Sequence, residues 1–157
     1  MRLAIAILLV ACGDNRHLPA VPDAAPPAAC TATYTGNLDE RATAPDPCVA
    51  ITGRSFAATV PSTLLDAPLA MAIDLGATAT AGDYTSAAVG GWSATGTRTV
   101  DHHACTYSAG SAAAPHGSFT LALDAAGHGR LTLETYVLAD PNTACGDPIT
   151  QDVELAF

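Results

Sequence analysis

The chain of 157 residues contains no lysine, and its six arginines stand against 15 acidic residues, which gives a net charge of −9. Proteins that bind nucleic acid neutralise the phosphates with clusters of lysine and arginine. The composition therefore excludes nucleic acid as an expected partner. The length also excludes a TIM barrel, which typically needs about 250 residues, and a two-domain dehydrogenase.

Bulky apolar residues are scarce as well. Hydrophobic residues make up 49% of the chain, but 34 of them are alanine, and only eight residues are aromatic. Leucine, isoleucine, valine and phenylalanine together number 31, close to the share of about 20% at which disorder becomes a concern. Since domains commonly have about 100–200 residues, the sequence predicts one small domain with few large side chains in its core.

The apolar run at the N-terminus, residues 3–11, is short. Its nine residues would rise about 13 Å as a helix, against about 30 Å for the hydrocarbon core of a bilayer. Arg2 places a positive charge before the run, and small residues follow it. A charged start, a short apolar segment and small residues are typical of a secretory signal peptide, which predicts export.

Leu9-Val10-Ala11-Cys12 closes this segment. These residues resemble the lipobox of bacterial lipoproteins, with an aliphatic residue three positions before an invariant cysteine and small residues before the cut. The resemblance implies that residues 1–11 are removed, that Cys12 carries the lipid, such as palmitate, and that this lipid anchors the protein to the membrane. The alternative is an ordinary secretory signal in which the cysteine occurs by chance.

The residue after the lipidated cysteine bears on location. In enteric bacteria an aspartate at this place retains a lipoprotein at the inner membrane, whereas this chain has Gly13 there and Asp14 one step later. The resemblance therefore implies the cell envelope, at the outer membrane of a Gram-negative bacterium.

Residues 14–29 interleave four prolines with alanines and a few charges, without the periodicity of a helix or strand. Such a segment is extended and solvated, at about 3 Å per residue. The predicted organisation is a signal peptide (1–11), a lipidated cysteine with a Pro/Ala-rich tether (12–29) and a single β domain (30–157).

Five cysteines are an odd number for an exported protein unless one of them carries a lipid. Without Cys12, the even set comprises Cys30, Cys48, Cys105 and Cys145. Four cysteines allow three pairings, and proximity in the sequence favours Cys30 with Cys48 and Cys105 with Cys145. The paired CxxC or CxxH spacing of zinc sites does not occur. We therefore expect two structural disulfides.

The C-terminal third alternates between apolar and polar residues, which is typical of half-buried strands. Alternation runs over residues 119–123, a turn with two glycines follows at 124–129, and alternation resumes over 131–137 and again from Val153 to Phe157, the last residue. These segments predict an antiparallel meander at the C-terminus.

Weaker alternation marks residues 31–35, 49–59, 69–75 and 100–107, and residues 62–67 could form a short helical turn. The 19 threonines favour strands, because β-branched side chains fit a pleated surface. Seven to nine short strands are expected. The predicted fold is all-β, an antiparallel sandwich or small barrel that ends in the meander and is cross-linked by two disulfides.

The most prominent polar cluster is Asp101-His102-His103, with His116 and His128 downstream. A zinc or copper site needs three or four converging ligands. On a strand Asp101 and His103 would share a face while His102 points away, and the other two histidines lie in glycine-flanked or proline-flanked segments typical of exposed loops. No metal site is predicted, and a metal-binding or hydrolytic domain around Asp101 and His103 is the alternative function.

Calcium binding by acidic loops is a further alternative. Calcium needs six to eight oxygens, and two acidic loops offer some: one holds Asp140, Asn142 and Asp147, the other Asp39, Glu40 and Asp46. Neither has EF-hand spacing, and these residues are also common turn formers.

A serine nucleophile is not indicated, because the stretch around Ser93 does not match the GxSxG motif. Paired catalytic carboxylates are not indicated either, because Glu134 and Glu154, two of only three glutamates, alternate with apolar residues as on a solvated strand face. No catalytic residue and no cofactor is predicted.

Trp92, Tyr84, Tyr107 and Tyr136 could form a platform for a sugar or peptide, although a single tryptophan in a small sandwich usually belongs to the core. The sequence names no particular protein or glycan partner. The leading hypothesis is a lipid-anchored envelope protein with a non-enzymatic binding or structural role.

Overall fold

The computed structural model describes residues 29–45, 47–110, 116–138, 143–146 and 148–157. Within these ranges the chain is all-β, as predicted, and forms no helix long and apolar enough to cross a membrane. The elements are β1 (Cys30–Gly36), β2 (Glu40–Ala44), β3 (Val49–Thr52), β4 (Ser55–Val60), β5 (Leu69–Asp74), β6 (Gly82–Thr85), β7 (Gly91–Val100), β8 (His103–Ala109), β9 (Ser118–Leu123), β10 (Gly129–Leu138), the short 3-10 helix η1 (Thr143–Cys145) and β11 (Ile149–Ala156).

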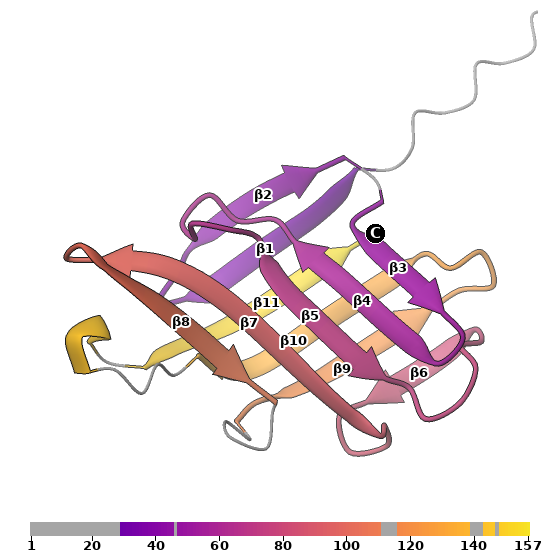
Figure 1. Cartoon of the computed structure of the whole chain (residues 1–157). Helices are drawn as coiled ribbons and strands as arrows, with labels where there is room; N and C mark the ends of the chain where they lie inside the picture. Colours follow the sequence, from indigo (N-terminus) through magenta and orange to yellow (C-terminus); the bar gives the residue numbers. More distant parts are fainter. Residues whose placement is uncertain (1–28, 46, 111–115, 139–142, 147) are drawn as a thin grey trace, which may run out of the picture.

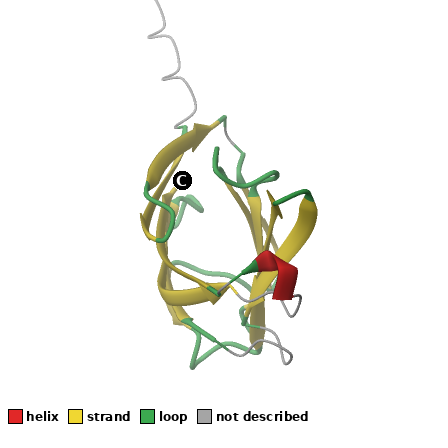
Figure 2. Cartoon of the chain, turned by 90° about the vertical axis from the view of Figure 1, so that its left-hand side faces the viewer, coloured by secondary structure: helices red, strands yellow, loops and turns green. Residues whose placement is uncertain are grey.

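Two antiparallel sheets form a sandwich, which is one of the two expected architectures (Figure 1). The described residues give a six-stranded sheet with the order β2-β1-β11-β10-β9-β6 and a five-stranded sheet with the order β3-β4-β5-β7-β8. Figure 2 shows the two sheets side-on as facing layers. The predicted C-terminal meander is confirmed as β9-β10-β11, and the last of these strands also pairs with β1.

The core lies between the sheets, where every second residue of each strand points. The largest fully buried side chains come from both sheets and include Phe56, Tyr107, Phe119 and Leu155. Phe157, which the alternation places at the end of a strand, follows β11 and is partly buried. Its ring lies 5.8 Å from that of Phe56, and its backbone N–H and carbonyl both pair with Gly129.

Both disulfides have the pairing that proximity favoured, Cys30 with Cys48 and Cys105 with Cys145. Cys30 begins β1 of the six-stranded sheet, and Cys48 directly precedes β3, an edge strand of the five-stranded sheet. Cys105 lies on β8, the opposite edge of that sheet, and Cys145 ends η1 in the connection to β11. The disulfides therefore tie both edges of the five-stranded sheet to the rest of the sandwich.

The expected number of strands was too low. The single strand predicted over 49–59 is a hairpin, β3 and β4, because the chain reverses at Gly53-Arg54. The strand predicted over 100–107 corresponds to β8, which begins at His103 after a turn at Asp101-His102. In addition, β2, β6 and β7 were not predicted. Their alternation is hard to see because the inward positions include small residues.

Gly96 illustrates why β7 has no apolar pattern. A Cβ atom at Gly96 would lie 3.3 Å from Leu65 Cδ1 and 3.4 Å from Leu69 Cδ1. Leu65, in the loop before β5, and Leu69, on the neighbouring strand β5, therefore fill the space that a larger side chain on β7 would need.

Residues 62–67, expected as a short helical turn, form a bent loop. Ser62 Oγ accepts hydrogen bonds from the backbone N–H groups of Leu64 and Leu65, at 3.1 and 3.2 Å, and this local bonding replaces helical hydrogen bonds. Asp66 then joins the loop to β7: its N–H donates to the carbonyl of Thr97 at 2.8 Å, and its carboxylate accepts from the hydroxyl of Thr99 at 2.8 Å.

Candidate functional site

A pocket of about 480 Å³ opens at the end of the sandwich where β1 and β7 finish and β11 begins. This volume is within the range of small-molecule sites, about 300–1,000 Å³. Its wall combines polar and apolar groups from both sheets, chiefly Asn37, Arg98, Val100, Asp101, Tyr107 and Ile149.

Arg98 is a charged residue at an inward position of β7. Residues 92, 94 and 96 of this strand face the other sheet, and Arg98 is the next residue in that register, opposite Cys105 on β8. Its side chain is partly buried, and none of the carboxylates that the structure describes forms an ion pair with it. The guanidinium has five N–H donors in a fork that matches a carboxylate. Arg98 is therefore a cationic group in an otherwise apolar register, with no carboxylate partner among the described residues.

Polar side chains hold the loop between β1 and β2 beside the pocket. Asn37 Oδ1 accepts the N–H of Thr150 at 2.7 Å. Gln151, only 1% exposed, accepts the N–H of Leu38 at 2.6 Å and donates from Nε2 to the carbonyl of Leu38 at 2.7 Å. Breaking the bonds of Gln151 would leave buried polar groups unpaired, which costs free energy. The bonds to Leu38 and Thr150 therefore hold Asn37, next to Leu38, in the pocket wall.

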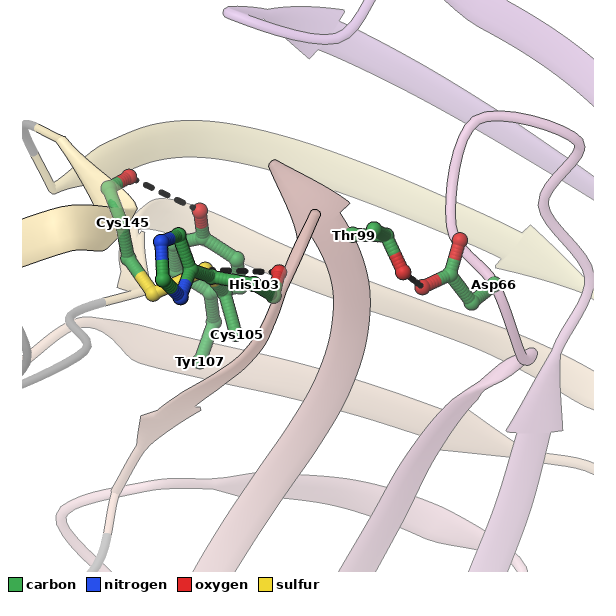
Figure 3. Close-up of a disulfide and its surroundings, with 6 residues drawn as sticks. All are labelled: Asp66, Thr99, His103, Cys105, Tyr107 and Cys145. Carbon is green, nitrogen blue, oxygen red and sulfur yellow. Dashed lines mark hydrogen bonds between the residues drawn. A yellow bond between two sulfur atoms is a disulfide. The ribbon is translucent and has the colours of Figure 1, made fainter. Parts of the chain in front are cut away.

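Cys145 and Tyr107 also line the pocket, and Figure 3 shows the disulfide that joins Cys145 to Cys105. The hydroxyl of Tyr107 donates to the carbonyl oxygen of Cys145 at 3.3 Å. Cys105 Sγ lies 3.5 Å from the carbonyl oxygen of His103, a contact only, since a disulfide sulfur has no proton to donate. Tyr107, weighed as part of an aromatic platform, is thus a buried support for the disulfide.

Asp101 and His102 form the two-residue turn between β7 and β8, and Val100 pairs with His103 across it. Both turn residues have positive φ angles, 45° and 69°, as a type I′ hairpin turn requires. The prediction that Asp101 and His103 share a strand face is therefore wrong, because the chain reverses between them. The acid lines the pocket, while His102 and His103 are exposed.

The other histidines lie elsewhere. His116 is exposed just before β9. His128 is exposed in the turn between β9 and β10, where its N–H donates to Asp124 Oδ1 at 2.9 Å. This bond and others to backbone N–H groups lower the pKa of Asp124. Across the described part of the chain, no three His, Cys, Asp or Glu side chains are placed to hold a metal ion.

Of the acidic residues weighed for calcium, Asp46, Asp140, Asn142 and Asp147 lie outside the described residues. Asp39 is in the β1–β2 loop, where its Oδ1 accepts the N–H of Gly36 at 3.3 Å.

Glu40 connects the two sheets. Its carboxylate, at the start of β2, accepts hydrogen bonds from the hydroxyl of Ser62 and from the N–H and hydroxyl of Thr63, the last two at 2.8 and 2.7 Å. Partial burial raises the pKa of this carboxyl, but the hydrogen bonds outweigh burial and lower the pKa overall. Glu40 is thus a structural link between β2 and the loop after β4.

Glu40 predicts an acid-sensitive part of the stability. A lowered folded pKa means that the contribution is present above the ordinary carboxyl value of 4.5 and is lost as the pH falls through the folded value. We expect Glu40→Gln to cost about 1 kcal/mol of unfolding free energy near pH 7, after allowance for solvent exposure. Urea unfolding at pH 7 and pH 3.5 checks this.

Glu134→Gln, which changes an exposed glutamate on β10, is the matched control and should change the unfolding free energy little at either pH. A cost for Glu40→Gln that stays constant between the two pH values would contradict the assignment.

The residues weighed for hydrolysis are dispersed over strands. Ser93 lies on β7 opposite Ala72 of β5, on the outer face of the five-stranded sheet. Glu134 and Glu154 lie on the outer face of the six-stranded sheet, where Glu154 forms an ion pair with Arg130 at 3.0 Å. They are solvated strand positions, as the alternation indicated.

Trp92 packs on the core rather than forming an open platform. Its ring meets that of Phe119 edge-on, with centroids 5.5 Å apart. A Cβ atom at Gly110 would lie 2.4 Å from the indole, so this position must be glycine. Tyr84, on β6, exchanges hydrogen bonds with Thr80, which lower the pKa of its hydroxyl. The side chain of Tyr136 is outside the described part.

Comparisons of the chain with protein-family models, with curated proteins and with solved structures find no match. The lipobox-like residues, including Cys12, lie outside the described residues. The function must therefore be inferred from the chemistry of this chain alone.

Arg98 and Asn37 were not predicted from the sequence as site residues. The available signal is that an arginine occupies an inward position of β7, two residues before Val100. This signal becomes visible only when the strand and its register are known.

Proposed function

We propose that the chain is a lipid-anchored cell-envelope protein whose β-sandwich has a non-enzymatic binding role. The observation that carries the proposal is the pair of disulfides, which use every cysteine of the domain and leave Cys12 over. Structural disulfides are typical of oxidising compartments outside the cytoplasm. A lipid on Cys12 accounts for the odd cysteine.

The physical chemistry of lipidation supports stable attachment. Each buried CH₂ group contributes about 0.8 kcal/mol, and although one acyl chain binds only marginally, two or more hold a protein firmly. By the lipobox resemblance, Gly13 after the cysteine favours the outer membrane of a Gram-negative bacterium.

The binding role is supported by the pocket at the end of the sandwich. A guanidinium, a side-chain amide and apolar side chains line it, and these groups hold a ligand by hydrogen bonds and packing. The tether of residues 12–29 would keep this site away from the bilayer surface.

Replacement of Cys12 tests the anchor. Expressed in a Gram-negative host with labelled palmitate, the natural chain should incorporate the label and partition into the detergent phase. Cys12→Ser should lose both properties, because the oxygen cannot form the thioether to the lipid, while mass spectrometry without reductant should still find both disulfides. Label incorporation by the Cys12→Ser chain would contradict the proposal.

A further inference from the structure

We infer that the pocket at the end of the sandwich binds a small molecule with one carboxylate and an apolar body, and that Arg98 pairs with the carboxylate. The inference rests on the proposed binding role and names its ligand class. Three features of the described residues support it: an unpaired guanidinium, a fixed backbone beneath it and a mixed polar and apolar wall.

The placement of Arg98 needs an explanation in a chain with this composition. Only six of its residues are basic and 15 are acidic, so carboxylates to pair with an arginine are abundant. Arg54 and Arg130 have such partners, Asp74 and Glu154, at 3.1 and 3.0 Å. Arg98 instead lines a pocket and forms no ion pair with any described carboxylate. Packing alone does not require an arginine here, because the next inward residue of β7, Val100, is apolar.

The backbone that carries Arg98 is fixed before any ligand arrives. Its two neighbours, Thr97 and Thr99, are both bonded to Asp66, through the carbonyl oxygen and the hydroxyl respectively, each at 2.8 Å. Figure 3 shows the hydrogen bond between the Thr99 hydroxyl and Asp66. Cys105, directly across from Arg98, is locked in that disulfide. A preorganised site loses less free energy on binding because little has to be ordered.

The remaining wall determines the other properties of the ligand. Ile149, only 7% exposed, and Val100 provide apolar contacts. Asn37 uses its Oδ1 atom to hold Thr150, and among the described residues nothing accepts a hydrogen bond from its Nδ2 atom, which leaves a second donor for a carboxylate oxygen. Asp101 adds a negative charge at the same pocket, which disfavours a second carboxylate on the ligand.

Titration with 3-phenylpropanoate tests the inference, with the neutral 3-phenylpropanamide as the comparison probe. The full chain in detergent micelles is followed by NMR through the methyl signals of Val100 and Ile149. We expect the carboxylate to shift these signals and the amide to bind at least about tenfold more weakly, since hydrogen bonds to charged groups are about twice as strong as those between neutral groups.

Variants locate the charge that recognises the probe. Arg98→Gln should weaken the binding of 3-phenylpropanoate about tenfold or more, whereas the matched control Arg54→Gln, at an exposed arginine paired with Asp74, should not change it. Asp101→Asn should tighten binding by removing a like charge, and asparagine is well suited to the positive φ of this turn position. Arg98→Lys keeps the positive charge and should bind more weakly than arginine but better than glutamine.

Equal affinity for the two probes in the natural chain would overturn the inference, even if Arg98→Gln failed to fold. So would unchanged binding of 3-phenylpropanoate in a folded Arg98→Gln or weaker binding in Asp101→Asn. Failure of these titrations would leave the lipid anchor unaffected, because palmitate incorporation measures the anchor independently.

Discussion

Removal of residues 152–157 is expected to unfold the domain. These residues include most of β11, which lies between β10 and β1 and pairs with both. The deletion removes the buried side chains of Val153 and Leu155, each contributing about 1.5–3 kcal/mol when fully buried, together with Phe157. It also separates β1 and β2 from the rest of the six-stranded sheet. The loss is comparable with the total stability of a small domain, about 5–15 kcal/mol.

Thermal unfolding measures this effect, and point variants separate packing from chain length. Leu155→Ala should cost about 2–5 kcal/mol as a large-to-small change in the core. The matched control Glu154→Ala, on the outer face of the same strand, removes an exposed ion pair with Arg130 and should cost no more than about 1 kcal/mol. Deletion of residues 14–28, in the predicted tether, should leave the melting temperature nearly unchanged.

A cooperative transition near the natural melting temperature in the C-terminal deletion would contradict the central place of β11. The sequence alone predicted that this strand covers the hairpin before it, since it follows that hairpin in the chain. Its second neighbour, β1, is more than 100 residues away in the sequence, and no local pattern indicates this pairing.

Strands with large inward side chains could be predicted from the sequence, whereas strands with small ones could not. Where leucine and phenylalanine alternate with polar residues, at 119–123 and 131–133, the strands were predicted correctly. On β2 and β7 the inward positions include Ala42, Ala94 and Gly96, which give no hydrophobic signal. Alanine-rich strands form here because neighbouring strands and the facing sheet supply the buried surface, a tertiary effect that overrides local propensity.

The site was harder to predict than the fold. Cysteine counting and proximity gave the correct disulfides because both pairs are near in sequence, 18 and 40 residues apart. The pocket, by contrast, combines Asn37, Arg98 and Ile149 from distant segments. The histidines form a conspicuous cluster in the sequence but do not converge in the described part of the structure. Arg98 stands out only through its inward position and its lack of a carboxylate partner among the described residues.

The disulfides are expected to contribute about half of the stability of the domain or more. In the chain-entropy model a disulfide stabilises by restricting the unfolded chain. Separations of 18 and 40 residues correspond to about 3 kcal/mol for Cys30–Cys48 and about 4 kcal/mol for Cys105–Cys145 at 25 °C. Together these values are comparable with the whole stability of many domains, about 5–15 kcal/mol. A core poor in large side chains has little other stabilisation to replace them.

Paired replacement by alanine tests each bond by thermal unfolding without reductant. Cys30→Ala with Cys48→Ala, and Cys105→Ala with Cys145→Ala, should each lower the melting temperature by about 10 °C or more, the second pair by the larger amount because its loop is longer. The quadruple variant should be unfolded or marginally stable at 37 °C. Cys12→Ser removes a cysteine outside both bonds and serves as the matched control, with no expected change in melting.

Position in the fold adds a second difference between the two bonds. Each one holds a different edge of the five-stranded sheet, β3 or β8, against the rest of the sandwich. Loss of Cys105–Cys145 should therefore increase hydrogen exchange in β8 more than in β3, and loss of Cys30–Cys48 should do the reverse. Equal melting temperatures for the oxidised and fully reduced protein would show that the sandwich is stable through packing alone, and the chain-entropy argument would then be wrong for this domain.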